Sequence, residues 1–136
     1  MLHAVKFVRV PKDVAYYLHL NDPKVIKALR YRFQFTPLIY GITCLVNQMV
    51  YVGSTLNPSK RFHKHLTIRN SDGSNKQLQA AITQYGMHNF KLHIFELVRL
   101  PREATYEEKR ALLRAVEQRY INHFPEAQRY NSNHHA

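Results

Sequence analysis

The stretch that decides the fold covers residues 38–55 and reads LIYGITCLVNQMVYVGST. Apolar and aromatic residues fill two short runs, residues 38–43 and 49–53, which are joined through residues 46–48. Asn47 in the connection tolerates the left-handed backbone conformation that a tight turn needs. The stretch therefore predicts a β-hairpin.

Two helices are predicted after the hairpin. Asn57 is a good N-cap and Pro58 suits the first helical position, so a helix is expected to run from there through Leu66. A second helix is expected over residues 75–85, where apolar residues recur at helical spacing. Residues 69–74 between them are polar and predict a loop.

A third strand and a long helix complete the predicted domain. Apolar and polar residues alternate over residues 90–94, which predicts a half-buried strand. The longest helix is expected over residues 103–124, where Glu107 and Glu108 suit the positive N-terminal end. Its predicted apolar face consists of Tyr106, Leu113, Val116, Tyr120 and Phe124. The order of elements predicts an α+β domain in which helices flank a small three-stranded antiparallel sheet.

The segment before the hairpin, residues 1–36, is expected to be a basic N-terminal extension of the domain at residues 37–131, and residues 132–136 a short tail. Residues 14–20 are apolar and aromatic, and their pattern does not decide between helix and strand. Asp22 followed by Pro23 predicts the start of a helix. That helix would turn Val25, Ile26 and Leu29 inward and Lys24, Lys27 and Arg30 outward.

The charge of the chain indicates a polyanionic partner. The 136 residues include 20 Lys and Arg against 9 Asp and Glu, a formal net charge of +11. This length supports one hydrophobic core and hence a single domain. Basic proteins gain affinity for nucleic acid because each neutralised phosphate releases counterions.

Several protein classes are excluded by composition. The single cysteine, Cys44, excludes an internal disulfide framework and a cysteine-based zinc cluster, and it fits a reducing compartment. The longest uncharged stretch, residues 33–59, is too polar to span a bilayer, so no membrane association is expected. The first residues lack the apolar run of a secretory signal. An intracellular location is therefore expected, and an organelle such as the mitochondrion is compatible with the basic start of the chain.

Five ordered motifs stand out from the rest of the sequence. They are Leu38-Ile39-Tyr40, Tyr51-Val52-Gly53-Ser54-Thr55, Arg61 with His65, Glu117 with Tyr120-Ile121, and Tyr130-Asn131. This series resembles that of the GIY-YIG nuclease domain, as found in intron-encoded homing endonucleases. One departure is Leu38, where the family usually has glycine.

The resemblance assigns a role to each motif tyrosine. Tyr40 would deprotonate the attacking water, and Tyr51 would orient the water or the phosphate. A free tyrosine has a pKa near ~10 and makes a poor base unless nearby positive charge favours its anion.

The resemblance also assigns the remaining members of an active set. Arg61 would contact the phosphate oxygens and stabilise the transition state. His65, one turn later on the same helix face, would either hydrogen-bond a tyrosine or phosphate or assist proton transfer. Asn131 would support the site near the metal or the backbone phosphate.

Glu117 would hold one divalent cation, Mg²⁺ or Mn²⁺, because such an ion takes further ligands from water and phosphate. Without the resemblance, Glu117 would be an ordinary boundary glutamate that pairs with Arg114 or Arg110. Six cations are predicted to contact nucleic acid: Lys24, Lys27, Arg30, Arg32, Lys60 and Lys64.

The predicted function is a metal-dependent endonuclease that hydrolyses DNA phosphodiester bonds. The chain stops five residues after Asn131, so the DNA-reading region of a homing endonuclease is expected to be lacking. An alternative is a nuclease-derived RNA-binding or structural protein of a ribonucleoprotein such as an organellar ribosome. A third is a factor that cuts branched DNA with little sequence preference.

Overall fold

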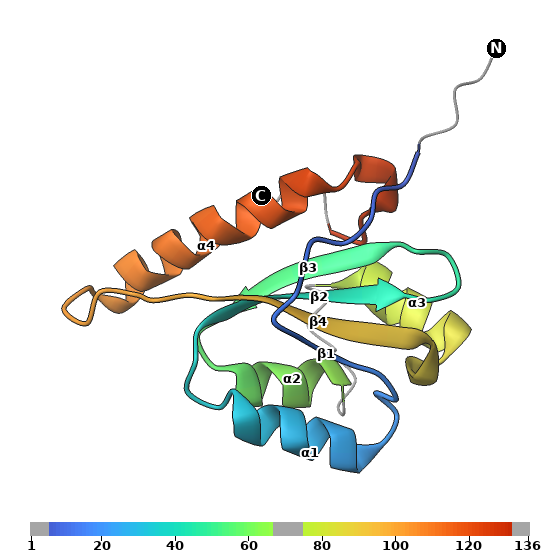
Figure 1. Ribbon diagram of the computed structural model, residues 1–136, viewed down its shortest axis with the longest axis horizontal. Helices are drawn as coiled ribbons and strands as arrows, with labels where there is room; N and C mark the ends of the chain where they lie inside the picture. Colours follow the sequence, from blue (N-terminus) through green and yellow to red (C-terminus); the bar gives the residue numbers. More distant parts are fainter. Residues whose placement is uncertain (1–5, 67–74, 132–136) are drawn as a thin grey trace.

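The computed structural model describes residues 6–66 and 75–131, without the side chains of Lys64 and His65. In this part of the chain, four strands form one antiparallel sheet in the order β1-β4-β2-β3. The strands are β1 (Ala15–Tyr17), β2 (Leu38–Cys44), β3 (Val50–Thr55) and β4 (Phe90–Leu97). The helices that flank the sheet are α1 (Pro23–Arg32), α2 (Pro58–Leu66), α3 (Lys76–Tyr85) and α4 (Tyr106–His123) (Figure 1). The α+β fold is thus confirmed, and the loop predicted at residues 69–74 and the predicted tail lie outside the described residues.

The expectation of three strands is wrong, because β1 adds a fourth. This strand has three residues and pairs with β4, with Tyr16 opposite His93. It comes from the stretch whose pattern did not decide between helix and strand. Its conformation depends on hydrogen bonds to a strand that is distant in the sequence, and the spacing of apolar residues within the stretch does not predict such hydrogen bonds. The predicted extension therefore contributes a strand to the same sheet.

The predicted hairpin is confirmed. Residues of β2 and β3 pair in antiparallel register, with Tyr40 opposite Gly53. The left-handed residue of the turn is Gln48, with φ of 65°, rather than Asn47. Asn47 instead accepts a hydrogen bond from the backbone N–H of Met49 at 2.9 Å, as a short amide side chain does in a turn.

Helices cover both faces of the sheet. Figure 1 shows α4 on one side, and α1 and α2 on the other. The buried cluster under α1, α2 and α3 includes Leu29, Tyr40 and Phe62, and the cluster under α4 includes Ile39 and Leu113. Because α1 contributes to the first cluster, part of the predicted extension belongs to the core.

The prediction of a half-buried β4 is wrong, because its second face is buried as well. His93 is 1% exposed and Phe95 is 3% exposed. The segment before β1 places Asp13 on His93, whose Nδ1 donates a hydrogen bond to it at 2.8 Å. Helix α4 places Tyr120 on Phe95, with stacked rings 5.2 Å apart.

Helix caps explain where the helices begin. The Asp22 side chain accepts from the N–H of Lys24 at 2.9 Å and starts α1, as predicted. Helix α4 is shorter than the predicted residues 103–124, because Thr105 and Glu108 form a reciprocal capping box that fixes its first turn. The inward position expected for Tyr106 is also wrong, since its side chain is 63% exposed.

The segment before β1 runs along the protein and is tied to its C-terminal part. The backbone of Val8 exchanges two hydrogen bonds of 2.9 Å with the Gln128 side chain. Gln128 is buried at the short 3₁₀ turn Glu126–Gln128 after α4. No helix among the described residues has the length and apolar composition needed to cross a membrane.

Candidate active site

Two tyrosines from neighbouring strands form the base of the candidate site. Tyr40 of β2 lies opposite Gly53 of β3, so Tyr51 projects from the same face of the sheet two residues away. The two rings lie 6.3 Å apart. Gly53 is required here, since a Cβ at this position would come 2.5 Å from the Tyr40 ring. The missing side chain lets Tyr40 lean across β3.

Arg61 of α2 joins the two hydroxyl groups. Its Nε donates to the Tyr40 hydroxyl at 3.2 Å, and its Nη2 donates to the Tyr51 hydroxyl at 3.4 Å. Phe62, the next residue, packs edge-on against the Tyr40 ring with centroids 5.1 Å apart. One turn of α2 therefore fixes both the guanidinium and the ring beneath it.

Both tyrosines are held in their neutral form by their surroundings. Burial raises the pKa of Tyr40 far above its ordinary value, and the neighbouring Tyr51 adds to the rise. Burial also raises the pKa of Tyr51. Arg61 opposes both shifts, because its charge and hydrogen bonds favour the phenolate. Either phenol would need positive charge in addition to Arg61 in order to act as a base.

Glu117 approaches from the opposite face of the sheet, on α4. Ser54 of β3 points toward α4, and its hydroxyl donates a hydrogen bond to Glu117 Oε1. Burial raises the pKa of Glu117, and the Ser54 hydrogen bond and the charge of Arg114 lower it in part. Within the described residues, Glu117 forms no salt bridge with Arg114 or Arg110. Its hydrogen-bond partner is thus a strand residue, and not the helix cation that the pattern would indicate without the resemblance.

The two halves of the site meet at the edge of the sheet. Strand β3 is the last strand in the sheet order. Its Tyr51 accepts a hydrogen bond from Arg61 of α2, and its Ser54 donates one to Glu117 of α4. Glu117 is near enough to act electrostatically on Arg61 and on both Tyr40 and Tyr51. A carboxylate, a guanidinium and two phenols therefore share one edge.

Asn131 lies along the outer edge of β3. Its Nδ2 donates to the Val52 carbonyl at 2.8 Å, and its Oδ1 accepts from the Val52 N–H at 2.9 Å. The preceding residue, Tyr130, donates its backbone N–H to the Val50 carbonyl at 2.8 Å. Asn131 thus holds the chain after α4 against the strand that carries Tyr51.

Not every predicted site residue can be placed. His65 belongs to α2, but its side chain lies outside the described residues, as does that of Lys64. The neighbouring His63 lies against α1, where its Nδ1 is 3.3 Å from Nη1 of Arg30.

The predicted nucleic-acid contacts divide into exposed and anchored cations. Lys24, Lys27, Arg32 and Lys60 are exposed, and of these Arg32 also donates its Nη1 to the Tyr17 hydroxyl at 3.3 Å. Arg30 is half-buried, and its Nε donates to the Ser59 carbonyl at 3.0 Å. Arg30 therefore links α1 to α2, in contrast to the outward position predicted for it.

The residues present fit a metal ion that needs few protein ligands. No group of three or more His, Cys, Asp or Glu residues that could hold a metal occurs in the described ranges. Ser54 occupies Oε1 of Glu117, which leaves Oε2 for a cation. Mg²⁺ and Mn²⁺ suit such a site, because they complete their coordination with water and substrate phosphate.

Sequence reasoning missed the roles of Gly53 and Ser54. The signal for both was the alternation of side chains along a strand, because Gly53 shares a face with Tyr51 and Ser54 shares the other face with Val52. The alternation of side chains does not predict which helix covers each face of the sheet.

Comparisons with known proteins agree with this geometry. A family model described as the GIY-YIG catalytic domain matches residues 36–131. "Probable intron-encoded endonuclease 1" of Neurospora crassa is 33% identical over 116 residues, which cover 83% of this chain and 35% of that protein. The chain thus spans about a third of the length of that relative.

A solved structure gives the same result for the fold. The catalytic domain of homing endonuclease I-TevI matches with a TM-score of 0.53 and 25% sequence identity. The match covers 70% of this chain and 96% of that one.

Proposed function

The chain belongs to the GIY-YIG family, and from this premise we propose that it is an endonuclease that hydrolyses phosphodiester bonds in DNA. The observation that carries the proposal is the position of Arg61. Its guanidinium donates to the hydroxyls of Tyr40 and Tyr51, and Glu117 is near enough for the charge of Arg61 to lower its pKa. The similarity to an intron-encoded endonuclease and to a homing endonuclease supports DNA as the substrate.

Arg61 supplies the charge that the reaction needs. A guanidinium has five N–H donors, and two of its nitrogens are engaged by the tyrosines. Remaining N–H groups are available to the phosphate oxygens, whose negative charge grows as water attacks the phosphorus. The same charge favours the phenolate, so Arg61 couples phosphate binding to base formation.

The tyrosines share the handling of the attacking water. Tyr40 is fully buried and Tyr51 is half-buried. In this proposal Tyr40 first releases its hydroxyl proton to solvent, and the phenolate then accepts the proton of the attacking water. Tyr51, which is more accessible, orients the water or the phosphate. The raised pKa of Tyr40 makes this step dependent on Arg61 and on the cation.

We assign the cation, Mg²⁺ or Mn²⁺, to Glu117. When bound, the ion supplies Lewis-acid stabilisation of phosphate charge. The protein contributes an oriented carboxylate, because Ser54 fixes Oε1. Asn131 positions the adjacent strand, and His65 remains a proposed partner of the phosphate.

The test is nicking of supercoiled plasmid by the purified chain in the presence of Mg²⁺. Glu117→Gln keeps the shape of the side chain and removes its charge, so nicking should fall by about a hundredfold or more. Glu126→Gln serves as the control, since Glu126 is an exposed carboxylate beyond the end of α4. Equal nicking by the wild type and by Glu117→Gln would contradict the proposal.

The alternative of an RNA-binding structural protein predicts a different result. Such a protein would sediment with large RNA particles and would leave both DNA and RNA uncut. Activity on plasmid that depends on Glu117 excludes this alternative as the sole function.

A further inference from the structure

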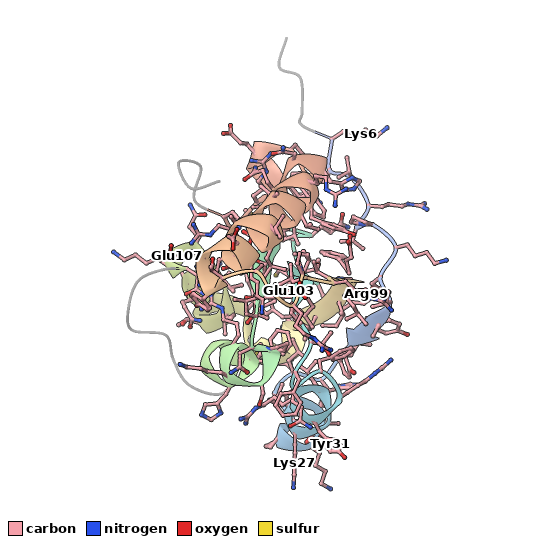
Figure 2. The ribbon with its side chains drawn as sticks, turned by 90° about the vertical axis from the view of Figure 1, so that its left-hand side faces the viewer. Lys6, Lys27, Tyr31, Arg99, Glu103 and Glu107 are labelled. Atoms are coloured by element: carbon pink, nitrogen blue, oxygen red, sulfur yellow. The ribbon has the colours of Figure 1, made fainter. Side chains whose placement is uncertain are left out.

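Two aromatic side chains at the end of α1 are strongly exposed. Tyr31 is 72% exposed, and Phe35, four residues later, is 86% exposed. Lys24 and Lys27 lie on the same side of α1 as Tyr31, because residues three, four and seven apart share a helix face. Figure 2 shows Lys27 and Tyr31 pointing away from the sheet. These four residues, Lys24, Lys27, Tyr31 and Phe35, are called the α1 stripe.

The charge around the α1 stripe suits a polyanion. Helices α1, α2 and α3 contain eight Lys and Arg residues, four on α1, three on α2 and one on α3, and no Asp or Glu. The opposite helix, α4, mixes three glutamates with four Lys and Arg residues. A protein surface that recognises an acidic partner would share this charge, but the proposed function makes DNA the polyanion to expect on this side of the sheet.

The α1 stripe lies next to the helix that carries Arg61. Arg30 on α1 donates to the carbonyl and the hydroxyl of Ser59 on α2, at 3.0 and 3.2 Å. Ser59 precedes Arg61 by two residues. A strand held at the proposed active site by Arg61 can therefore continue over α1.

Exposed aromatic rings on a cationic surface favour single-stranded DNA over duplex DNA. In a duplex, each base already stacks on its neighbours, and only phosphates and groove edges are presented. An unpaired base offers its flat face, and stacking on an exposed ring is the usual contact for it. Tyr31 and Phe35 are exposed enough to provide such faces.

We propose that the α1 stripe binds a single-stranded segment of DNA next to the cleaved phosphate. Lys24 and Lys27 neutralise phosphates of this segment, and Tyr31 and Phe35 stack on its unpaired bases. The preferred substrate class is accordingly DNA with unpaired nucleotides, such as a flap or a branch. The placement beside the cleaved phosphate rests on the proposed function, whereas binding itself requires no cleavage.

The test measures binding by fluorescence anisotropy in the Glu117→Gln background, so that the oligonucleotides stay intact. The probes are an oligo-dT of about 20 nucleotides and a blunt duplex of the same length. About 20 nucleotides are enough to extend across one domain. The double change Tyr31→Ala with Phe35→Ala should weaken oligo-dT binding by about twentyfold or more, and duplex binding by less than about twofold. Tyr106→Ala, which removes an exposed ring from α4, should change neither.

A rescue pair separates stacking from folding. Tyr31→Trp with Phe35→Trp keeps a ring at both positions and should restore oligo-dT binding. The thermal midpoint of each variant shows that it is folded. Plasmid nicking is also measured for the Tyr31→Ala, Phe35→Ala variant in the protein that retains Glu117. Loss of the two rings should leave nicking of duplex plasmid intact, so this measurement tests the proposed function separately from the α1 stripe.

Three outcomes would overturn the proposal. The first is equal binding of oligo-dT by the Tyr31→Ala, Phe35→Ala variant and its parent. The second is an equal loss for oligo-dT and duplex, which would make the rings part of a duplex contact. The third is a change in sedimentation from dimer to monomer on the same substitutions, which would make a second copy of the chain the occupant.

Discussion

The two faces of the sheet differ in charge and in the groups they bring to the proposed active site. The face under α1, α2 and α3 carries cations and the phenols of Tyr40 and Tyr51, and those helices contain no carboxylate. The face under α4 carries Glu117. Glu117 has Arg110 and Arg114 near it on α4, yet its hydrogen bond is to Ser54 of the sheet. In the proposed mechanism this separation keeps the guanidinium for phosphate and the carboxylate for the cation.

Two consecutive residues of β3 connect the faces. Gly53 lies under Tyr40, and Ser54 hydrogen-bonds Glu117 on the other side. Side chains of successive strand residues point to opposite faces, so one peptide unit fixes the position of both halves. The difference between the faces can therefore be tested by changes that affect one half at a time.

The largest effect is expected from a change on the cationic face, Arg61→Lys. Lysine keeps the charge but cannot donate to two hydroxyls and a phosphate from one planar group. The catalytic rate should fall by about a hundredfold or more, as it does when a transition-state donor is lost. Single-turnover cleavage of a labelled oligonucleotide measures this rate.

Lys60→Arg is the matched control, since Lys60 is the exposed neighbour of Arg61. It should leave the single-turnover rate within about twofold of wild type. Cleavage by Arg61→Lys at the wild-type rate would show that charge alone is sufficient.

The next effect is expected from Gly53→Ala, which acts on the same face through packing. The new Cβ would lie 2.5 Å from the Tyr40 ring, so the ring must move away from Arg61. We expect a loss of about 2 kcal/mol in the free energy of unfolding and of about tenfold or more in cleavage rate. Denaturant unfolding and single-turnover cleavage measure the two quantities.

Gly41→Ala provides a control on the other face. Its Cβ would lie 2.5 Å from the Phe95 ring, in the cluster under α4. A similar loss of stability with a smaller loss of activity is expected. Equal activity losses in the two variants would mean that the rate follows stability and not the Tyr40–Arg61 contact.

A smaller effect is expected on the α4 face from Ser54→Ala. The Ser54 hydrogen bond lowers the pKa of Glu117, so its removal lets burial raise that pKa further. The carboxylate must be deprotonated to hold a cation. The acid limb of the kcat/KM profile should therefore shift to higher pH, and the plateau should fall by about tenfold.

Ser59→Ala tests whether this effect is specific. Ser59 is also a serine whose hydroxyl is hydrogen-bonded, but its partner is Arg30 on the cationic face, from which the hydroxyl accepts. Its loss should leave the acid limb in place. An unshifted profile for Ser54→Ala would remove Ser54 from the Glu117 environment.

Local signals were enough to predict most of the fold. The caps at Asp22 and Thr105 and the hairpin around Gln48 depend on residues a few positions apart, and the elements they start or join were found from the sequence. Strand β1 was not predicted from the sequence, because it forms only by pairing with β4. The outward position predicted for Arg30 is wrong for the same reason, because its hydrogen bond joins α1 to a separate helix, α2.

The site was predicted only as far as its motifs allowed. Arg61 was found together with Tyr40 and Tyr51 because the order of the motifs is specific, and the structure brings the three side chains together. The supporting role of Ser54 depends on which helix covers each face of β3. The two hydrogen bonds between Asn131 and Val52 depend on how the chain after α4 returns to the sheet.

The smallest expected effect is a pH dependence of stability from His93, on the face under α4. His93 is buried and its Nδ1 donates to Asp13, so its Nε2 accepts from the Thr43 hydroxyl at 3.0 Å. Burial lowers the pKa of His93, and the hydrogen bond to Asp13 raises it in part. The folded protein thus keeps His93 neutral at a pH where the unfolded chain, with a histidine pKa near ~6.5, binds a proton. The free energy of unfolding should fall as the pH drops below about 6.5.

Thermal midpoints of wild type and His93→Gln between pH 8 and pH 5, a range that spans the ordinary histidine pKa of ~6.5, measure this dependence. The wild type should lose stability more steeply on acidification than His93→Gln, which has no proton to bind at this position. His88→Gln is the control, because His88 is exposed and its removal should keep the wild-type slope. Parallel slopes for wild type and His93→Gln would show that His93 accepts a proton as readily in the folded protein as in the unfolded chain.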